Sequence, residues 1–597
     1  MLEVADRIRK LRELMKEAEI DFYIVPTADF HQSEYVGEYF KARKFMTGFT
    51  GSAGTIVVSR EEVGLWVDGR YFIQAANQIK GAPITLFKMG EPGVPTINEY
   101  LETKLKEGEK LGFDGRVVSM SEGLEYEKIV QNKKGHIVSG QDLVDKVWEN
   151  RPPISEEVAF ALDEKYTGES VSSKLKRIRK KMSENKADAH ILNTIDDICW
   201  TLNIRGNDIE FFPLVLSYGI IYMGHMDLYI DEKKLDSRMK EKLKKENIFL
   251  HPYNSFYEAV KNIAEGKSVM LDPAKINYAT FNNIPRGVEK VEENNPEILF
   301  KSMKNEVEVE NIRQAQIKDS VCYVKFMKWL KENYEKGDIT ELSASAKLDE
   351  LRNEQKNYIR PSFAPICAYG PHSASPHYES SPKTDVVLEA GNFFLADTGA
   401  GFLEGSTDIT RTYALGEVSQ DKKEDFTLVA VSNLRLASAK FLYGSTGMVL
   451  DILARKPFWD RNINFNHGTG HGVGYLLGIH EGPSGFRWNF RSHESHQLEA
   501  GMVITNEPGI YYEGSHGVRL ENELLVCNGE KNEYGQFMYL EPITYIPFDI
   551  EAIEPKIMTQ EDKTLLNDYH KLVFEKISPF LDEEEKVWLE KFTREVE

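Results

Sequence analysis

A repeated pattern in the first half of the chain limits the folds that it can adopt. Residues 7–11 begin a basic, amphipathic helical pattern that leads into a short apolar strand pattern at residues 21–27. The same order returns at residues 177–182 and 189–194. In each copy a segment with aromatic and glycine residues follows, and then a β-rich stretch. Matching helix and strand periodicities in the same order predict a duplicated α/β domain.

Proline-containing polar segments mark the expected domain boundaries. Pro152 and Pro153 predict a stiff connector between the two copies. A second boundary is expected near Pro296, before a helical pattern with one apolar face, formed by Ile317, Val321, Val324, Met327 and Leu330. We therefore expect an α/β (α+β) chain with domains at 1–151, 152–300 and 301–597, the last ending in a charged helical extension from about residue 550.

Composition and charge exclude several classes of protein. The 597 residues are 41% hydrophobic and 28% charged, which is ordinary for a globular chain with several cores. A net charge of −21 argues against a general affinity for nucleic acid or for an anionic membrane. The N-terminus lacks the apolar run of a secretory signal, the longest apolar runs are too short to cross a bilayer, and the four cysteines are scattered. These features together predict a cytoplasmic protein.

Five potential metal ligands follow one another in the last third of the chain: Asp397, Asp408, His471, Glu507 and Glu521. Four carboxylates and one imidazole form a mostly oxygen ligand set, which suits hard or borderline divalent ions better than a thiolate-rich site does. We expect two divalent ions, with Mn²⁺ as the first choice and Zn²⁺ or Co²⁺ as alternatives. Two such ions form a hydrolytic centre, because together they acidify a shared water and polarise the bond to be cut.

The two aspartates are expected on facing strands. Asp397 ends the apolar segment 392–396, a glycine-rich connection follows, and Asp408 opens the segment 409–413. Antiparallel pairing of these strands brings the two carboxylates together, where a cation would relieve their repulsion. The alternative is that each aspartate only caps its own turn.

Glycine surrounds the two histidines of the segment 467–474. Gly468, Gly470 and Gly472 argue against a regular helix, so we expect a loop that presents one histidine to metal and the other to substrate. The alternative is an ordinary surface histidine.

The two glutamates are expected on strands. Glu507 follows an apolar run and precedes Pro508, so we place it at the end of a strand. Glu521 is expected inside a strand at 517–526, where alternation puts Arg519, Glu521 and Glu523 on one face. The alternative is a solvated outer face, which we discount for Glu521 because the strand is otherwise apolar.

The ordered ligand set resembles that of the pita-bread metallopeptidase superfamily, which includes methionine aminopeptidase, prolidase, creatinase and aminopeptidase P. The chain is most similar to the three-domain, cytosolic-type aminopeptidase P family, over nearly its whole length. Further motifs carry this resemblance, at residues 31–35, 48–55, 66–72, 203–206 and 480–483. The resemblance implies two creatinase-like N-terminal domains, followed by a pita-bread catalytic domain.

The resemblance also implies a role for each ligand and an activity. Asp397 is expected to chelate one metal, Asp408 and Glu521 to bridge both, and His471 and Glu507 to bind the other. The implied activity is that of an Xaa-Pro aminopeptidase, which uses a hydroxide bridging two metals to cut the bond between an N-terminal residue and a following proline. The implied partners are peptides with proline at the second position and a second copy of the chain, as relatives are commonly dimers.

Residues around the metal ligands acquire expected roles from the same resemblance. His377 is expected near the substrate as a proton shuttle, His480 at the scissile carbonyl and His467 on the proline side of the site. Glu507 is the expected proton acceptor from the bridging water. Arg70 is a candidate to reach substrate from the first domain.

Three further residues and two rival functions remain open. His31 is a second candidate to reach substrate, although a structural role is equally open for it and for Arg70. Trp459 is a candidate to contact a partner subunit, and its alternative is a position in the core. Asn506 precedes Glu507 at a position where some relatives have aspartate. The rival functions are a prolidase-type dipeptidase and a non-catalytic, peptide-binding member of the fold.

Overall fold

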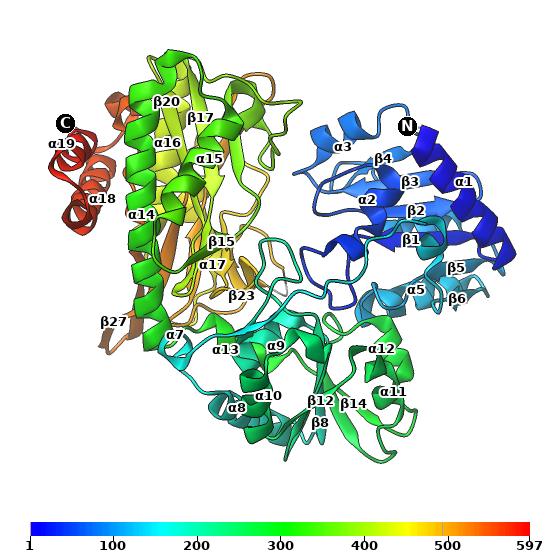
Figure 1. Cartoon of the computed structure of the whole chain (residues 1–597). Coiled ribbons are helices and arrows are strands. Elements are labelled where there is room, and N and C mark those ends of the chain that lie inside the picture. Colours follow the sequence, from blue (N-terminus) through cyan, green and yellow to red (C-terminus); the bar gives the residue numbers. More distant parts are fainter. Residues whose placement is uncertain (1, 492–493) are drawn as a thin grey trace. The chain divides into compact units, whose positions relative to one another are not determined.

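The computed structural model describes residues 2–491 and 494–597 and divides into two compact units. The first unit comprises Met1–Asp163 and Glu169–Glu297, and the second comprises Glu164–Gly168 and Ile298–Glu597 (Figure 1). Each unit has its own sheets and core, and each is described by itself.

The first unit contains two six-stranded sheets of the same design. One has the order β4-β3-β2-β1-β5-β6 and the other the order β12-β11-β10-β8-β13-β14. The strands of the first sheet are β1 (Phe22–Pro26), β2 (Thr55–Ser59), β3 (Val63–Val67), β4 (Thr85–Lys88), β5 (Lys110–Phe113) and β6 (His136–Val138). Those of the second are β8 (Ala189–Leu192), β10 (Ser217–Tyr222), β11 (Met226–Ile230), β12 (Ile248–His251), β13 (Ser268–Leu271) and β14 (Glu289–Glu292).

Strand pairing confirms that the two sheets are copies. The central strand β1 pairs antiparallel with β2 and parallel with β5, and β8 pairs antiparallel with β10 and parallel with β13. A helix leads into each central strand, α1 (Leu2–Glu17) before β1 and α8 (Val171–Glu184) before β8. Each helix buries one face, which includes Leu11 in α1 and Ile178 in α8. Leu11 shares an apolar cluster with residues of β1 and β2. The predicted duplication of an α/β domain is therefore correct.

The second unit begins with the long helix predicted from its apolar face. This helix, α14, spans Glu306–Asn333 and is capped by Asn305, whose side chain accepts hydrogen bonds from the amides of Val307 and Glu308. Val321, Val324, Met327 and Leu330 are buried in the core of the unit, as predicted, and Ile317 packs against it half-buried. The helices α15 (Glu341–Asn353), α16 (Gln420–Ala437) and α17 (Gly447–Trp459) follow in this unit.

Two sheets of the second unit carry the residues of the candidate site. A three-stranded sheet has the order β16-β17-β20, and a six-stranded sheet has the order β21-β28-β27-β24-β22-β23. The strands of the first are β16 (Ile366–Tyr369), β17 (Asn392–Thr398) and β20 (Ile409–Leu415). Those of the second are β21 (Lys440–Leu442), β22 (Gly470–Val473), β23 (His480–Phe486), β24 (Val503–Asn506), β27 (Asn522–Asn532) and β28 (Gly535–Pro542). A two-stranded sheet pairs β25 (Gly509–Tyr512) with β26 (His516–Arg519). Another three-stranded sheet has the order β15-β18-β19, formed by β15 (Tyr358–Pro361), β18 (Ala400–Phe402) and β19 (Gly405–Ser406).

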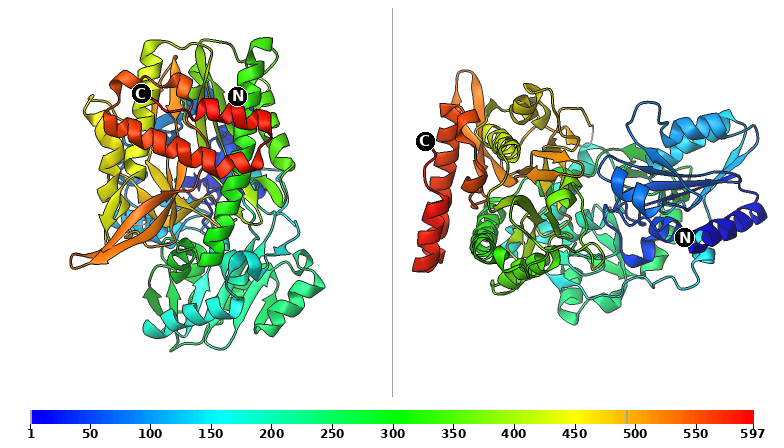
Figure 2. Two further views of the ribbon diagram at one scale, coloured as in Figure 1. Left: turned by 90° about the vertical axis from the view of Figure 1, so that its left-hand side faces the viewer. Right: turned by 90° about the horizontal axis from the view of Figure 1, so that it is seen from above.

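The last residues of the chain close the core of the second unit. Two helices, α18 (Gln560–Ile577) and α19 (Glu583–Phe592), confirm the predicted helical character of this segment. Figure 2 shows these red helices lying across α14, which both of them contact. Val573 and Leu589 share one apolar cluster with Leu330 of α14. The C-terminal segment is therefore part of the packed second unit.

No helix within the described residues is long and apolar enough to span a membrane. All four cysteines are free thiols, three of them buried and Cys527 half-buried.

Candidate metal centre

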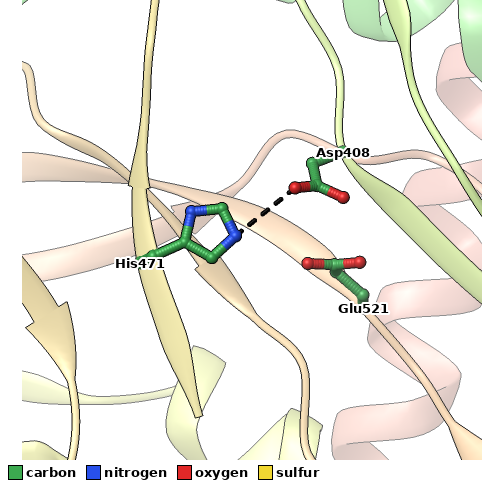
Figure 3. A group of neighbouring side chains, drawn as sticks. All are labelled: Asp408, His471 and Glu521. Carbon is green, nitrogen blue, oxygen red and sulfur yellow. Dashed lines mark ion pairs between the residues drawn. The ribbon is translucent and has the colours of Figure 1, made fainter. Parts of the chain in front are cut away.

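Three of the five predicted ligands converge in the second unit. Potential ligand atoms of Asp408, His471 and Glu521 all lie within 4.8 Å of one another (Figure 3). Asp408 and Glu521 are buried, and His471 is half-buried. Asp408 directly precedes β20, His471 lies in β22 and Glu521 directly precedes β27, so distant segments build one pocket of ligands.

The hairpin interpretation of the two aspartates is confirmed. Strands β17 and β20 pair antiparallel along their whole length, with Asp397 opposite Thr410. The Oδ2 atom of Asp397 accepts hydrogen bonds from Nε of Arg519, at 3.2 Å, and from Nη2 of the same guanidinium. Its Oδ1 atom is buried and has no hydrogen-bond partner among the described residues. A buried carboxylate oxygen without a partner is costly, so this atom needs a ligand.

His471 does not lie in a loop, as the sequence suggested, but in strand β22. Glycine permits this because the strands approach very closely: a Cβ atom on Gly470 would lie 1.8 Å from the carbonyl oxygen of Thr505. Nδ1 of His471 donates to the carbonyl of Gly472 at 2.9 Å, which leaves Nε2 as the free ligand atom. This Nε2 lies 3.4 Å from Asp408 and 3.7 Å from Glu507.

Glu507 stands where the sequence placed it, directly after strand β24. Its amide donates to the carbonyl of Thr469 at 2.7 Å, and one carboxylate oxygen lies 3.5 Å from the hydroxyl of Thr505. Thr505 also accepts from the amide of His471 at 3.1 Å. The two predicted ligands of one metal are thus held by the same threonine.

The prediction of one continuous strand through Glu521 is wrong. Strand β26 ends at Arg519 and β27 begins at Asn522, so Glu521 lies where the chain crosses from one sheet to another. There its amide donates to the carbonyl of Thr410 at 3.0 Å, and its carboxylate accepts from the hydroxyl of Thr410 at 2.8 Å. These two hydrogen bonds to Thr410 of β20 hold Glu521 in place of ordinary strand pairing, and they turn its carboxylate toward Asp408.

The solvated outer face considered for the residues around Glu521 is also wrong, because Arg519, Glu521 and Glu523 are all buried. Glu523, which the sequence analysis left without a role, accepts from the amide of Asp408 at 2.7 Å. Arg519 was likewise left without a role, although it binds Asp397. The alternation of charged residues along 519–523 was the sequence feature that could have identified both Arg519 and Glu523.

Electrostatics favours a cation in this pocket. Burial and the charge of Asp408 raise the pKa of Asp397 to about 6, although Arg519 opposes this. Burial raises the pKa of Glu507, and burial with the charges of its neighbours raises that of Glu521 well above its usual value. Against the effect of burial, Asp408 and Glu507 raise the pKa of His471 to about 9. Divalent cations remove this repulsion, so the residues present fit a site for divalent metal.

One further histidine ring lies beside a proposed ligand. The ring of His480 is exposed and its centroid lies 4.1 Å from that of His471. His377 is half-buried, and the carbonyl of the preceding Pro376 accepts from Arg519 at 3.2 Å.

His467 belongs to a directed hydrogen-bond chain. Arg519 donates to the hydroxyl of Tyr511 at 2.8 Å, and Tyr511 donates to Nε2 of His467 at 2.9 Å. Nδ1 of His467 donates to the carbonyl of Gly468 at 2.7 Å. Burial and the nearby Arg519 lower the pKa of His467 to about 3, so the ring is neutral. No sequence motif points to Tyr511, apart from its place four residues after Glu507.

Arg70 and His31 lie in the first unit. Arg70 is half-buried and donates to both oxygens of Asp68 at 2.8 Å. His31 is fully buried, and its ring nitrogens bond to the carbonyl of Asn193 and the hydroxyl of Tyr253, both at 2.7 Å. Its contacts favour a structural role for His31, and the substrate role of Arg70 remains a prediction.

Comparison with known protein families gives a consistent result along the chain. Residues 7–147 and 150–308 each match a Creatinase/Prolidase N-terminal domain. Residues 310–528 match metallopeptidase family M24, and residues 536–596 match the C-terminal region of peptidase M24.

Individual relatives match over nearly their full length. A probable Xaa-Pro aminopeptidase P from Pyricularia oryzae is 34% identical, with 99% of each chain covered. Xaa-Pro aminopeptidase 1 from Dictyostelium discoideum is 34% identical over 97% of this chain and 94% of its own.

Among solved structures, an X-prolyl aminopeptidase from Caenorhabditis elegans, described as a cytosolic enzyme with a di-nuclear active site, superposes with a TM-score of 0.94. It is 32% identical and covers 100% of both chains. An Xaa-Pro dipeptidase from Bacillus anthracis, 25% identical with a TM-score of 0.50, covers 64% of this chain and 99% of its own.

Proposed function

This chain belongs to the aminopeptidase P group of metallopeptidase family M24, and from that premise we propose that it is a metal-dependent Xaa-Pro aminopeptidase. It removes the first residue of peptides whose second residue is proline. The observation that carries this proposal is full-length similarity to such enzymes, including both N-terminal domains. The division into domains at 1–151, 152–300 and 301–597 is part of the proposal.

Five residues are proposed to hold two divalent ions. Asp397 would hold one ion, His471 and Glu507 would hold the other, and Asp408 and Glu521 would be shared by both. The convergence of Asp408, His471 and Glu521 and the raised pKa values of the carboxylates support this assignment. Once bound there, two divalent ions would supply an acidified water and a polarised scissile carbonyl. The mostly oxygen donor set favours Mn²⁺ over Zn²⁺ or Co²⁺.

Two residues are proposed to handle protons. Glu507 accepts the proton that the attacking water loses, which suits a carboxylate whose pKa is raised by burial. The proline nitrogen has no hydrogen in the peptide and must gain one before it leaves. His377 donates this proton, and its position next to Pro376, which is held by Arg519, supports the role.

Three further residues are proposed to bind substrate. His480 lies beside the ring of His471 and is suited to donate to the scissile carbonyl oxygen. His467, neutral and bonded to Tyr511, lines the proline side of the site. Arg70 in the first unit is proposed to contact the peptide.

The exposed face of α17 supports a homodimer. Met448, Val449, Ile452 and Trp459 are between 39% and 57% exposed on this one helix. An apolar helix face of this kind suits contact with a second copy of the chain. Trp459 is thus a surface residue, and we place it at the dimer interface. We also propose a cytoplasmic location.

Peptide specificity tests the proposed function. After chelation and addition of Mn²⁺, the enzyme should release arginine from Arg-Pro-Pro, with little release from Arg-Ala-Ala. Cleavage of the dipeptide Arg-Pro alone would instead identify a prolidase, a reading that the partial overlap with the dipeptidase structure does not favour. A protein that holds two metal ions and cleaves none of the three peptides would be a binding module.

A further inference from the structure

We propose that Tyr569, in the C-terminal helix α18, is a positioning residue for the metal centre and acts through Arg411. The inference rests on the proposed function, because it takes Asp408 and Glu521 to be the bridging ligands. It assigns to the C-terminal segment a part in metal binding, although that segment supplies none of the five ligands.

The two bridging carboxylates come from segments that need to be tied together. Asp408 leads into β20 of the three-stranded sheet, whereas Glu521 leads into β27 of the six-stranded sheet. Thr410 makes the nearest tie, since its carbonyl and its hydroxyl both bond to Glu521. The separation of the two carboxylates therefore depends on how β20 and the crossover at Glu521 are held against each other.

Arg411 clamps these two segments. Its Nη1 donates to the carbonyl of Thr410 at 2.8 Å and to the carbonyl of Glu521 at 2.6 Å. Its Nη2 lies within 2.9 Å of Asn522 Oδ1, the carbonyl of Ile546 and the hydroxyl of Tyr569. Arg411 is fully buried, so these groups take the place of water around its charge.

Tyr569 fixes the far side of the guanidinium. Its hydroxyl accepts from Arg411 and lies 3.1 Å from Asn522 Oδ1, 3.0 Å from the carbonyl of Thr544 and 2.8 Å from that of Ile546. The side chain is almost fully buried. Helix α18 is itself anchored, because Asp562 in its first turn receives two hydrogen bonds from Arg435 of α16. The guanidinium is thus held between an anchored helix and the backbone of Glu521.

Removing only the phenolic oxygen tests the inference. Tyr569→Phe keeps the ring but removes one of the three oxygens around Nη2 of Arg411. Metal-free enzyme should therefore bind Mn²⁺ about 10-fold more weakly. Electron paramagnetic resonance should show weaker coupling between the two Mn²⁺ ions. The matched control is Tyr413→Phe, since Tyr413 is also fully buried and its hydroxyl has no hydrogen-bond partner among the described residues. This control should bind Mn²⁺ as the wild type does.

The outcomes separate this inference from the proposed function. Wild-type affinity and wild-type coupling in Tyr569→Phe, with at most a lower melting temperature of the metal-free protein, would make Tyr569 merely structural and overturn the inference. Cleavage of Arg-Pro-Pro by the wild type in the same experiment would leave the proposed function standing. If the wild type binds no Mn²⁺, both fall. Should Tyr569→Phe not fold, Arg411→Lys removes the forked contacts while keeping the charge, and it should weaken Mn²⁺ binding about 10- to 100-fold.

Discussion

Two histidines four residues apart illustrate how strongly the surroundings set the chemistry of a side chain in this protein. His467 faces Tyr511 and Arg519, and its pKa falls to about 3. His471 faces Asp408 and Glu507, and its pKa rises to about 9. The first ring is therefore suited to line a pocket in its neutral form. The second stands among anions, where a cation or a proton must balance their charge.

Replacing His377 tests proton delivery to the leaving proline nitrogen. His377→Ala should lower kcat by about 10²- to 10⁴-fold, the usual contribution of a general acid. Metal content measured by mass spectrometry should stay at the wild-type value, because His377 is not a proposed ligand. His225→Ala, at a partly exposed histidine of the first unit, is the matched control. Unchanged turnover in His377→Ala would remove the proposed role.

The stability of the folded protein at low pH should depend on the buried imidazole of His570. Burial and the charge of Arg411 lower its pKa to about 3, below the value of about 6.5 in an unfolded chain. The unfolded state therefore takes up a proton that the folded state does not, and stability falls as pH drops from about 6.5 toward 3. This one group contributes up to about 1.4 kcal/mol per pH unit in that window.

His570→Gln should flatten the loss of melting temperature between pH 7 and pH 4.5. Its matched control, His136→Gln at an exposed histidine, should keep the wild-type slope. Equal slopes in all three proteins would contradict the lowered pKa of His570.

At the scale of elements, short strands carry the site, and their close approach determines its geometry. Strand β22 holds His471 and pairs on one side with β23 and on the other with β24, which Glu507 follows. The pairing of β22 shifts register between His471 and Gly472. A small displacement of this strand therefore moves a ligand relative to the others.

Gly470→Ala should disrupt this packing. The added Cβ would lie 1.8 Å from the carbonyl oxygen of Thr505, so β22 must move away from β24. We expect a loss of about 1–3 kcal/mol in stability and weaker Mn²⁺ binding. Gly224→Ala, where a Cβ would meet no atom within 4 Å, serves as the control. Wild-type Mn²⁺ affinity in Gly470→Ala would show that the strand spacing does not govern the ligand geometry.

Periodic sequence patterns predicted the helices and strands better than the places where the chain passes from one sheet to another. The apolar face of α14, the two helix–strand copies and the hairpin of Asp397 and Asp408 were all readable, because local spacing encodes them. The break before Glu521 was not readable, because continuous alternation hides a change of sheet. Arg411 and Tyr569 are 158 residues apart in the sequence, and no local pattern predicts a contact over such a separation. The ligand roles came from family resemblance and remain to be tested.

At the scale of the whole molecule, the α17 face makes a prediction about assembly. Val449→Asp should convert a dimer into a monomer, because it places a charge in an apolar contact. Sedimentation equilibrium at several concentrations measures this change. Val587→Asp on α19, at a position that is 67% exposed, should leave the mass unchanged. A wild-type monomer, or a dimer unaffected by Val449→Asp, would contradict the proposed interface.

The most direct test of the central claim is a stepwise titration of metal-free enzyme with Mn²⁺ while release of arginine from Arg-Pro-Pro is followed. Five ligands that hold two ions predict activity that rises as Mn²⁺ binds and reaches its plateau at two equivalents per chain. Full activity without metal, or a protein that binds two equivalents and still leaves the peptide intact, would contradict a dinuclear Xaa-Pro aminopeptidase.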